Sequence, residues 1–378
     1  MSTASAAATT TAPASGARGY RRHLRLVRTR AMAVWVVVLA AALAYLPWVV
    51  NEKNLFGLAL SKHDLLNVNM TTLNTTLLLL IGALGLNIVT GYTGLISIGN
   101  AGLFALGALV ASASGIKWLQ WPFPVCLLLA GLAGATVGAL VGLPALRIRG
   151  IYLLLATLGF HYVMFFLYGR YQVTWFGFGS VVFDRPATLF GFKLNTDIRW
   201  YYFLLGFTIV AFLLAKNLLR SRQGRAFVAV RDHQIAAAMA GIDVAKTRIV
   251  SFSVSSALIT MAGAMYAWYI GAAGQDTFTL LFAIGFIAII IVGGEGSLVG
   301  TVLGAILWQL VPRALEAGAE MSAEISPGVG NWVTQWLTQI TLVIFGFLIL
   351  AVMVLQPNGL AGIWARVKRS FVRWPYTT

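Results

Sequence analysis

The sequence has 378 residues, of which 59% are hydrophobic and only 10% are charged, and its formal net charge is +16. Its mean hydropathy is +0.83, and so much apolar surface exceeds what one water-soluble core could bury. The composition therefore excludes an ordinary soluble domain and indicates a membrane protein. The positive charge does not indicate nucleic-acid binding, because no stretch of the sequence combines clustered Lys and Arg with the features of a soluble domain.

The N-terminal segment is predicted to be a disordered, basic, cytoplasmic tail over residues 1–30. Residues 1–17 are almost entirely Ala, Thr, Ser, Pro and Gly, and six arginines follow between residues 18 and 30. The apolar run 31–50 comes next. It is long enough to cross a membrane and no small-residue cleavage site follows it, so it is interpreted as a first membrane span rather than a signal peptide.

Apolar runs recur as far as residue 355 and predict an all-α polytopic membrane protein with about ten transmembrane helices, and at least eight. Runs of roughly 17 to 25 residues suit a helix that crosses a hydrocarbon layer, whereas barrel strands would alternate in polarity. Residues 31–355 are predicted to be the transmembrane domain, and residues 356–378 a basic cytoplasmic tail. The predicted spans are 31–50, 70–90, 95–114, 122–144, 151–169, 200–216, 249–270, 279–292, 297–311 and 334–355, of which the eighth and ninth are short and interrupted by glycine.

The distribution of Lys and Arg predicts the orientation in the membrane. With the N-terminus placed inside, nineteen of the 27 basic residues fall on the inner side and eight, Arg313 among them, on the outer side. This arrangement satisfies the positive-inside rule. We therefore expect a multi-pass membrane protein with both termini in the cytoplasm, and this topology accounts for the high positive charge.

The segment 91–100 is unusual because it places several glycines and polar residues between two apolar runs. Such a stretch is tolerated at membrane depth where the backbone faces protein or a water-filled cavity. A broken helix there would offer backbone donors and acceptors to a small solute. The polar side chains predicted near such a path are Asn87, Thr90, Ser97, Asn100, Thr157 and His161. The alternative for each of them is an ordinary hydrogen bond between helices.

Two sets of glycines recur every four residues and predict close packing between helices. Small residues at this spacing form a face along which helix backbones approach each other. The residues are Gly134, Gly138 and Gly142 in one apolar run and Gly296, Gly300 and Gly304 in another.

Two connecting segments are long enough for a role of their own. The outer loop 170–199 is rich in aromatic residues and glycine, which suggests a small packed cap or a docking surface for an external partner. The inner loop 217–248 contains apolar residues at helical spacing from 227 to 239, interspersed with charged and polar ones. This pattern predicts a short amphipathic helix or helix pair on the cytoplasmic face. From periodicity alone, a membrane-surface helix without a partner is equally compatible with it.

The sequence lacks its own energy source for transport. It contains no phosphate-binding loop, since the glycine-rich stretch 293–297 has no lysine. The predicted spans contain essentially no acid, so an ion-coupled secondary transporter is weakly supported. A non-transporting scaffold and a channel are further alternatives, although no filter-like pattern favours the channel. The single cysteine, Cys126, lies in an apolar run and predicts neither a disulfide framework nor a metal site.

Several stretches resemble the second, M-type permease subunit of branched-chain amino acid ABC importers, in the hydrophobic amino acid uptake family. They are GLNIVTGYTGLISIGNAGLFALGAL (85–109), GLPALRIRGIYLLLATLGF (142–160), RPATLFGFKL (185–194), GRAFVAVRDHQIAAAMAGIDVAKTRIVSFSVSSALITMAGAMYA (224–267), IVGGEGSLVGTVLGA (291–305) and QPNGL (356–360). The resemblance runs in the same order from about residue 70 to 362. It is therefore more specific than any single motif.

The resemblance implies a transport subunit of a bacterial inner membrane that is not itself an enzyme and holds no cofactor. Such permeases pair with a homologous permease, two cytoplasmic ATPases that bind ATP and Mg, and an extracytoplasmic solute-binding protein. Their solutes are Leu, Ile and Val, and similar permeases carry urea, short amides or aromatic and other carboxylic acids. The family's ATPase-coupling loop falls here on Gly224, Arg225, Arg231, Asp232, Ala236, Ala237 and Gly241.

The sequence departs from the commoner family pattern at a few positions. Asn100 stands where His is frequent, Ala238 where Glu is common, and Thr301 where Pro is usual. The outer loop has Thr-Trp-Phe-Gly at 174–177 where a Thr-Gly-Gly turn is typical. These departures leave the expected fold unchanged but leave the transported solute open.

Overall fold

The computed structural model describes residues 43–48, 50, 54–55, 58–59, 69–148, 150–177, 179–189, 191–325, 327–356 and 359–373. The chain divides into two compact units, Met1–Gly57 and Leu58–Thr378. Within the described part of the first unit, residues 43–48 are helical and β1 covers Asn54–Leu55. The predicted N-terminal tail and most of the first predicted span lie outside the described residues.

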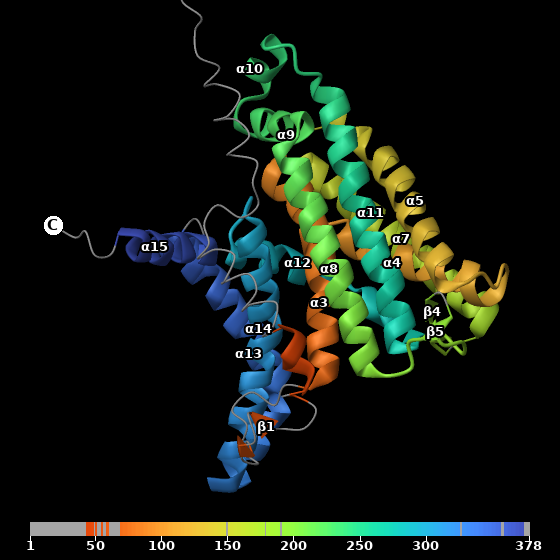
Figure 1. Cartoon of the computed structure of the whole chain (residues 1–378), viewed down its shortest axis with the longest axis vertical. Coiled ribbons are helices and arrows are strands. Elements are labelled where there is room, and N and C mark those ends of the chain that lie inside the picture. The colour runs from red at the N-terminus through yellow and green to blue at the C-terminus, as the bar shows by residue number, and fades with distance from the viewer. Residues whose placement is uncertain are drawn as a thin grey trace, which may run out of the picture. The chain divides into compact units, whose positions relative to one another are not determined.

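The second unit is a bundle of long helices (Figure 1). Its elements in chain order are β2 (Leu58–Ala59), α3 (Met70–Asn87), the π-helix η1 (Ile88–Tyr92), α4 (Asn100–Ser112), the π-helix η2 (Ala113–Lys117), α5 (Phe123–Gly142), α6 (Pro144–Arg147), α7 (Ile151–Phe176), β3 (Val181–Val182), β4 (Thr188–Leu189), β5 (Phe192–Lys193), α8 (Asp197–Arg220), α9 (Arg222–Asp232), α10 (Gln234–Met239), α11 (Val244–Ile270), β6 (Ala272–Ala273), the 3-10 helix η3 (Gln275–Phe278), α12 (Leu280–Gly293), α13 (Leu298–Ile325), α14 (Pro327–Leu355) and α15 (Gly359–Arg373).

Within the described residues, eight helices are long and apolar enough to cross a membrane, and α12 is a shorter apolar helix. These nine correspond in order to the predicted spans from the second onward, which confirms an all-α polytopic membrane fold. Several boundaries differ from the predictions. Helix α7 ends at Phe176 rather than at residue 169, α11 begins at Val244 rather than at residue 249, and α14 begins at Pro327 rather than at residue 334. Helix α4 begins at Asn100 rather than at residue 95, because Gly94 has a positive φ of 71° and the residues from it to Gly99 are not helical. Helix α13 continues to Ile325 through Pro312, well past the predicted end at residue 311.

The longer α13 changes the interpretation of two charged residues. Arg313, which the sequence analysis placed in an outer loop, lies inside this helix and forms an ion pair with Glu316 at 2.7 Å. The candidate span Leu298–Ala319 therefore contains an acid, contrary to the expectation that the spans hold essentially none. Because Glu316 is paired one turn away with a cation, it is poorly suited to act as a free ion relay.

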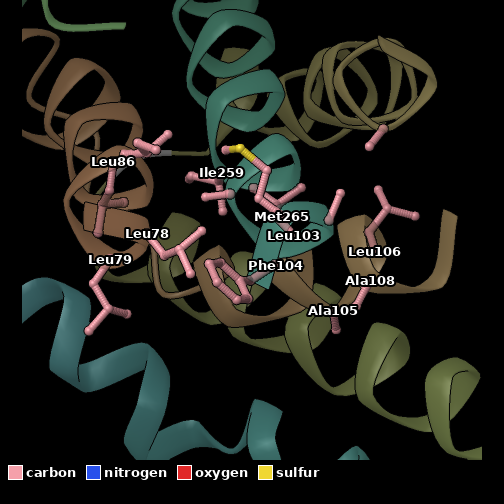
Figure 2. Packing of buried hydrophobic residues seen from close by; sticks show 14 of the residues in the cluster. Leu78, Leu79, Leu86, Leu103, Phe104, Ala105, Leu106, Ala108, Ile259 and Met265 are labelled. Atoms are coloured by element: carbon pink, nitrogen blue, oxygen red, sulfur yellow. The ribbon is translucent and has the colours of Figure 1, made fainter. Parts of the chain in front are cut away.

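Helix α11 is the central element of the second unit and packs against α3, α4 and α5. Figure 2 shows apolar side chains of α3, α4 and α11 meeting around Phe104, whose ring also lies 5.2 Å from that of Phe282. The backbones approach closely here. A Cβ added to Gly107 would lie 2.0 Å from the Thr260 carbonyl oxygen, and one added to Gly263 would lie 2.0 Å from the Phe104 carbonyl oxygen. Small residues on facing helices thus create this core.

The predicted outer loop folds into short strands with an aromatic interior. Strands β3 and β6 pair antiparallel, with Val181 opposite Ala273, and β4 and β5 form a hairpin. The ring of Phe183 packs 5.3 Å from that of Trp268 on α11. This small cap lies at the opposite end of the bundle from α9 and α10 (Figure 1).

The predicted C-terminal tail is largely helical. Residues Gly359–Arg373 form α15, which is strongly amphipathic and packs against α12 and α13. A Cβ added to Gly359 would lie 2.5 Å from the Gly294 nitrogen, so the start of α15 is pressed against the turn that precedes α13. The last five residues lie outside the described part of the chain.

Candidate functional site

The predicted amphipathic loop is a pair of short helices, α9 and α10, at one end of the bundle. Helix α9 begins where the Ser221 hydroxyl accepts a hydrogen bond from the Gly224 N–H, a typical N-cap. Gly224 is sterically required, because a Cβ there would lie 2.3 Å from the Leu219 Cα. Phe227 and Val230 are buried, so one face of α9 is anchored on the bundle.

Helix α10 presents an apolar face outward. Ala237 is buried, while Ile235 and Met239, one turn apart, are 69% and 86% exposed. Gly241 ends this helix with a positive φ of 80°, a conformation that glycine adopts without strain. Asp243 then caps α11 by accepting a hydrogen bond from the Lys246 N–H at 3.0 Å. The chain therefore forms a compact protrusion whose exposed tip is hydrophobic.

The glycine-rich segment 91–100 is a break between two helices, as the sequence predicts. After α3, the chain widens into the π-helix η1, and residues 93–99 are not helical. Local hydrogen bonds hold this shape, since Leu95 N–H donates to the Val89 oxygen and the Thr93 hydroxyl donates to the Ile88 oxygen. π-Helical turns of this kind occur frequently at functional sites.

Arg231 of α9 connects the helix pair to this break. Its guanidinium donates a hydrogen bond to the carbonyl oxygen of Gly91, 140 residues earlier in the chain. It also lies against two glycines with positive φ. A Cβ on Gly94 would lie 3.0 Å from the Arg231 Cγ, and one on Gly296 would lie 2.6 Å from an Arg231 nitrogen. The two tight turns thus leave room for the arginine because neither carries a side chain.

Asn87, at the end of α3, joins the break to the turn before α13. Its amide oxygen accepts a hydrogen bond from the Gly296 N–H at 3.0 Å. Its amide nitrogen donates to the Thr301 hydroxyl at 2.8 Å and to the Ser297 carbonyl at 3.2 Å. Asn87 and Thr301 are both fully buried. In the sequence, Thr301 is distinguished only as a departure from the family pattern, because its hydrogen bond with Asn87 joins residues 214 positions apart.

The other residues of the predicted path are buried, and most take part in hydrogen bonds between or within segments. The Thr157 hydroxyl accepts from Ile98 N–H at 3.1 Å, and Ser97 and Thr90 bond within the break. Asn100 donates to the Ala283 oxygen, while its own amide oxygen has no partner among the described residues. Both ring nitrogens of His161, which is only 1% exposed, likewise have no hydrogen-bond partner among the described residues.

The predicted glycine faces lie in different environments. Gly134, Gly138 and Gly142 all face α11, where a Cβ on Gly138 would lie 2.4 Å from the Ser256 Cβ. Gly300 and Gly304 face α12 in the same manner. Gly296, which the sequence analysis grouped with them, precedes α13 instead, because its positive φ of 74° forms a turn.

Comparison with known proteins identifies the family. The family described as branched-chain amino acid transport system / permease component matches residues 69–353. This match covers most of the chain, including all of the site described above. The chain belongs to this permease family. The family assignment and the apolar helices together make it a multi-pass membrane protein.

Individual relatives of this permease are similar over part of their length. The high-affinity branched-chain amino acid transport system permease protein LivM of Salmonella typhimurium is 31% identical over 59% of this chain and 57% of its own length. LivM of Escherichia coli K12 is 31% identical over 61% of this chain and 59% of its own length. The autoinducer 2 import system permease protein LsrC of an Enterobacter species is 31% identical over 54% of this chain and 58% of its own length. The permease thus spans less than two thirds of these relatives, and no solved structure matches it.

Proposed function

We propose that this permease is the membrane-spanning subunit of an ATP-driven ABC importer for branched-chain amino acids. The family match over residues 69–353 and the similarity to LivM support the solute class. The geometry of α9 and α10 supports the mode of energy supply. We expect ATP and Mg to bind on two partner ATPases, with a homologous second permease and an extracytoplasmic binding protein completing the importer.

The single observation that carries this proposal is the exposed apolar tip of α10. Ile235 and Met239 lie one turn apart and face outward at the end of the bundle, where they form an apolar surface that a docked partner would cover. A partner bound to the tip of α10 would also be connected to the bundle, because Phe227 and Val230 pack the neighbouring helix α9 against it. The residues named from the family resemblance, Arg231, Asp232, Ala236, Ala237 and Gly241, all belong to α9, α10 or the turn that follows.

The orientation follows from the same assignment. Docking of ATPases places α9 and α10 in the cytoplasm and the aromatic cap around β3–β6 outside. With this orientation the positive-inside rule is satisfied in a bacterial inner membrane. We propose alternating access, in which a loaded binding protein docks on the cap and closure of the ATPases draws on α9 and α10. The solute would then pass between this permease and its homologue.

A direct test is purification of the tagged chain from its native membrane in mild detergent, followed by mass spectrometry of the proteins that accompany it. The proposal requires a second permease and ATPases with phosphate-binding loops in the complex. Reconstituted with its binding protein, the complex should accumulate labelled leucine only with ATP inside. Recovery of the chain alone, with uptake driven by a proton or sodium gradient, would replace the proposal by an ion-coupled transporter.

The solute has a second candidate class. LsrC, an autoinducer 2 import permease by name, is about as identical to this chain as LivM is, although over a somewhat shorter stretch. The resemblance to permeases for urea, short amides and carboxylic acids leaves these solutes open as well. Thermal-shift screening of the accompanying binding protein separates them, since stabilisation by leucine, isoleucine and valine supports the first assignment and stabilisation by another class contradicts it.

A further inference from the structure

Arg231 is the side chain by which α9 reaches the two glycine breaks of the bundle. Helix α9 ends at Asp232, and α10 ends at the Gly241 turn, so no continuous helix runs from α10 into α11. A displacement of α10 is therefore not transmitted to the membrane-spanning helices through one continuous helix. A side-chain contact between α9 and the bundle provides a more direct route.

The acceptor that Arg231 meets is suited to a cation. Gly91 lies in the last turn of η1, and the chain leaves helical geometry at residue 93. The last carbonyls of a helix lack donors within that helix, and the negative end of the helix dipole lies there. The Arg231 guanidinium thus donates a hydrogen bond to the Gly91 oxygen, and its positive charge lies at the negative end of the helix dipole.

The turn at Gly91, which accepts this hydrogen bond, is in contact with the second break at Gly296. A Cβ on Gly91 would lie 2.5 Å from the Gly296 nitrogen, so the two turns are in direct contact. Asn87 fastens them together through the Gly296 N–H and through Ser297 and Thr301. A force applied at the Gly91 oxygen therefore acts on α3 and α13 together.

We propose that Arg231 is a positioning residue that transmits movement of α9 to the joined breaks at Gly91 and Gly296, and so couples ATP hydrolysis to opening of the bundle. This inference rests on the proposed function, because it requires ATPases at α10. It assigns the transmission to one guanidinium and its contacts with two turns. This positioning role requires no contact of Arg231 with solute or nucleotide.

The test compares Arg231→Gln with Arg222→Gln in the purified, reconstituted complete importer. Arg222 is the matched control, since it lies on the same helix, carries the same charge and is exposed. We expect Arg231→Gln to lower ATP-driven uptake of labelled leucine at least about tenfold while ATP hydrolysis stays within about twofold of the unchanged importer. Arg231→Lys should be intermediate, because an ammonium lacks the planar fork of donors. Arg222→Gln should behave as the unchanged importer.

A second measurement does not depend on the solute. In a Cys126→Ser background, spin labels at Ile96→Cys in the break and Phe192→Cys in the cap report their distance with and without ATP. Both positions are exposed, at 47% and 80%. The ATP-dependent change in distance should disappear with Arg231→Gln and persist with Arg222→Gln.

Three outcomes would overturn the inference: equal behaviour of the two variants, an unchanged distance response in Arg231→Gln, or loss of the ATPases from the Arg231→Gln complex. The last would make Arg231 an assembly contact. If the unchanged chain purifies without ATPases, the proposed function fails first, and with it the basis of this inference.

Discussion

Two regions of the molecule are rich in glycine for different physical reasons. On α5, Gly134, Gly138 and Gly142 have ordinary helical geometry and allow α11 to lie close. Around Arg231, Gly94 and Gly296 have positive φ and form turns. The first set fixes the distance between two helices, whereas the second shapes backbone breaks that a helix outside the bundle contacts. Substitutions should therefore destabilise the first region and impair function in the second.

The largest expected effect is on the first region. Gly138→Leu would force a side chain into the Ser256 side chain and the Phe252 carbonyl, which lie 2.3 and 2.7 Å from the position of a Cβ. Overpacking of this kind typically costs about 1–3 kcal/mol and here meets backbone, so we expect little folded protein. Fluorescence-detected gel filtration in detergent measures it. Gly206→Leu on α8, where a Cβ meets nothing within 4 Å, is the control and should remain folded.

The second region is tested by Gly94→Ala. The substitution brings a Cβ to 3.0 Å from Arg231 and places alanine at a positive φ, a strain of about 1–2 kcal/mol. We expect a folded protein with uptake reduced about tenfold in the reconstituted importer. Gly177→Ala also places alanine at a positive φ, of 76°, but at a position where the added Cβ would meet nothing within 4 Å. If both variants lose uptake equally, strain alone explains the loss and the comparison between the regions is wrong.

Thr301→Val tests the link between the breaks at Gly91 and Gly296. The change nearly preserves shape but removes the hydroxyl that accepts a hydrogen bond from the buried Asn87 amide at 2.8 Å. A buried donor left without a partner costs about 1–3 kcal/mol, so the melting temperature in detergent should fall by several degrees. Thr136→Val should leave the melting temperature nearly unchanged, because this hydroxyl is exposed and bonds only within its own helix. Equal melting temperatures for the two variants would show that the Asn87 network adds no stability.

The smallest effect on stability is expected at the tip of α10. Met239→Ser replaces a side chain that is 86% exposed, so the melting temperature of the isolated chain should change little. Recovery of ATPases with the tagged chain should nevertheless fall severalfold, because apolar area at the docking surface is lost. Phe192→Ser in the cap, which is 80% exposed, serves as the control. Undiminished recovery with Met239→Ser would remove α10 from the docking surface.

The architecture was largely predictable because hydrophobic length and helical period are local properties of the sequence. The apolar runs predicted nine helices in order, and the glycine spacing on α5 indicated a packing face. The end of α13 was not predictable in this way, since Pro312 and the Arg313–Glu316 pair suggest a loop when neighbours are unknown. Tertiary packing overrides such local signals.

The candidate site was predictable only in parts. The sequence indicated the break at 91–100 and the helix pair at 217–248 separately, and the family resemblance named Arg231. Nothing local relates Arg231 to Gly91, because their contact joins residues 140 positions apart. Likewise, the four-residue spacing placed Gly296 on a helix, whereas its φ of 74° is set by the turn that Asn87 holds.

The position of α10 between two non-helical points also bears on how such importers could be re-engineered. The chain leaves helical geometry at His233 and again at Gly241, and only Ala237 of the six α10 residues is buried. Residues 233–241 are thus a nearly self-contained insert whose replacement disturbs few contacts of the bundle. Under the proposed function, exchange of these nine residues between related permeases would change which ATPase docks on the permease. Arg231 and its partners would stay in place.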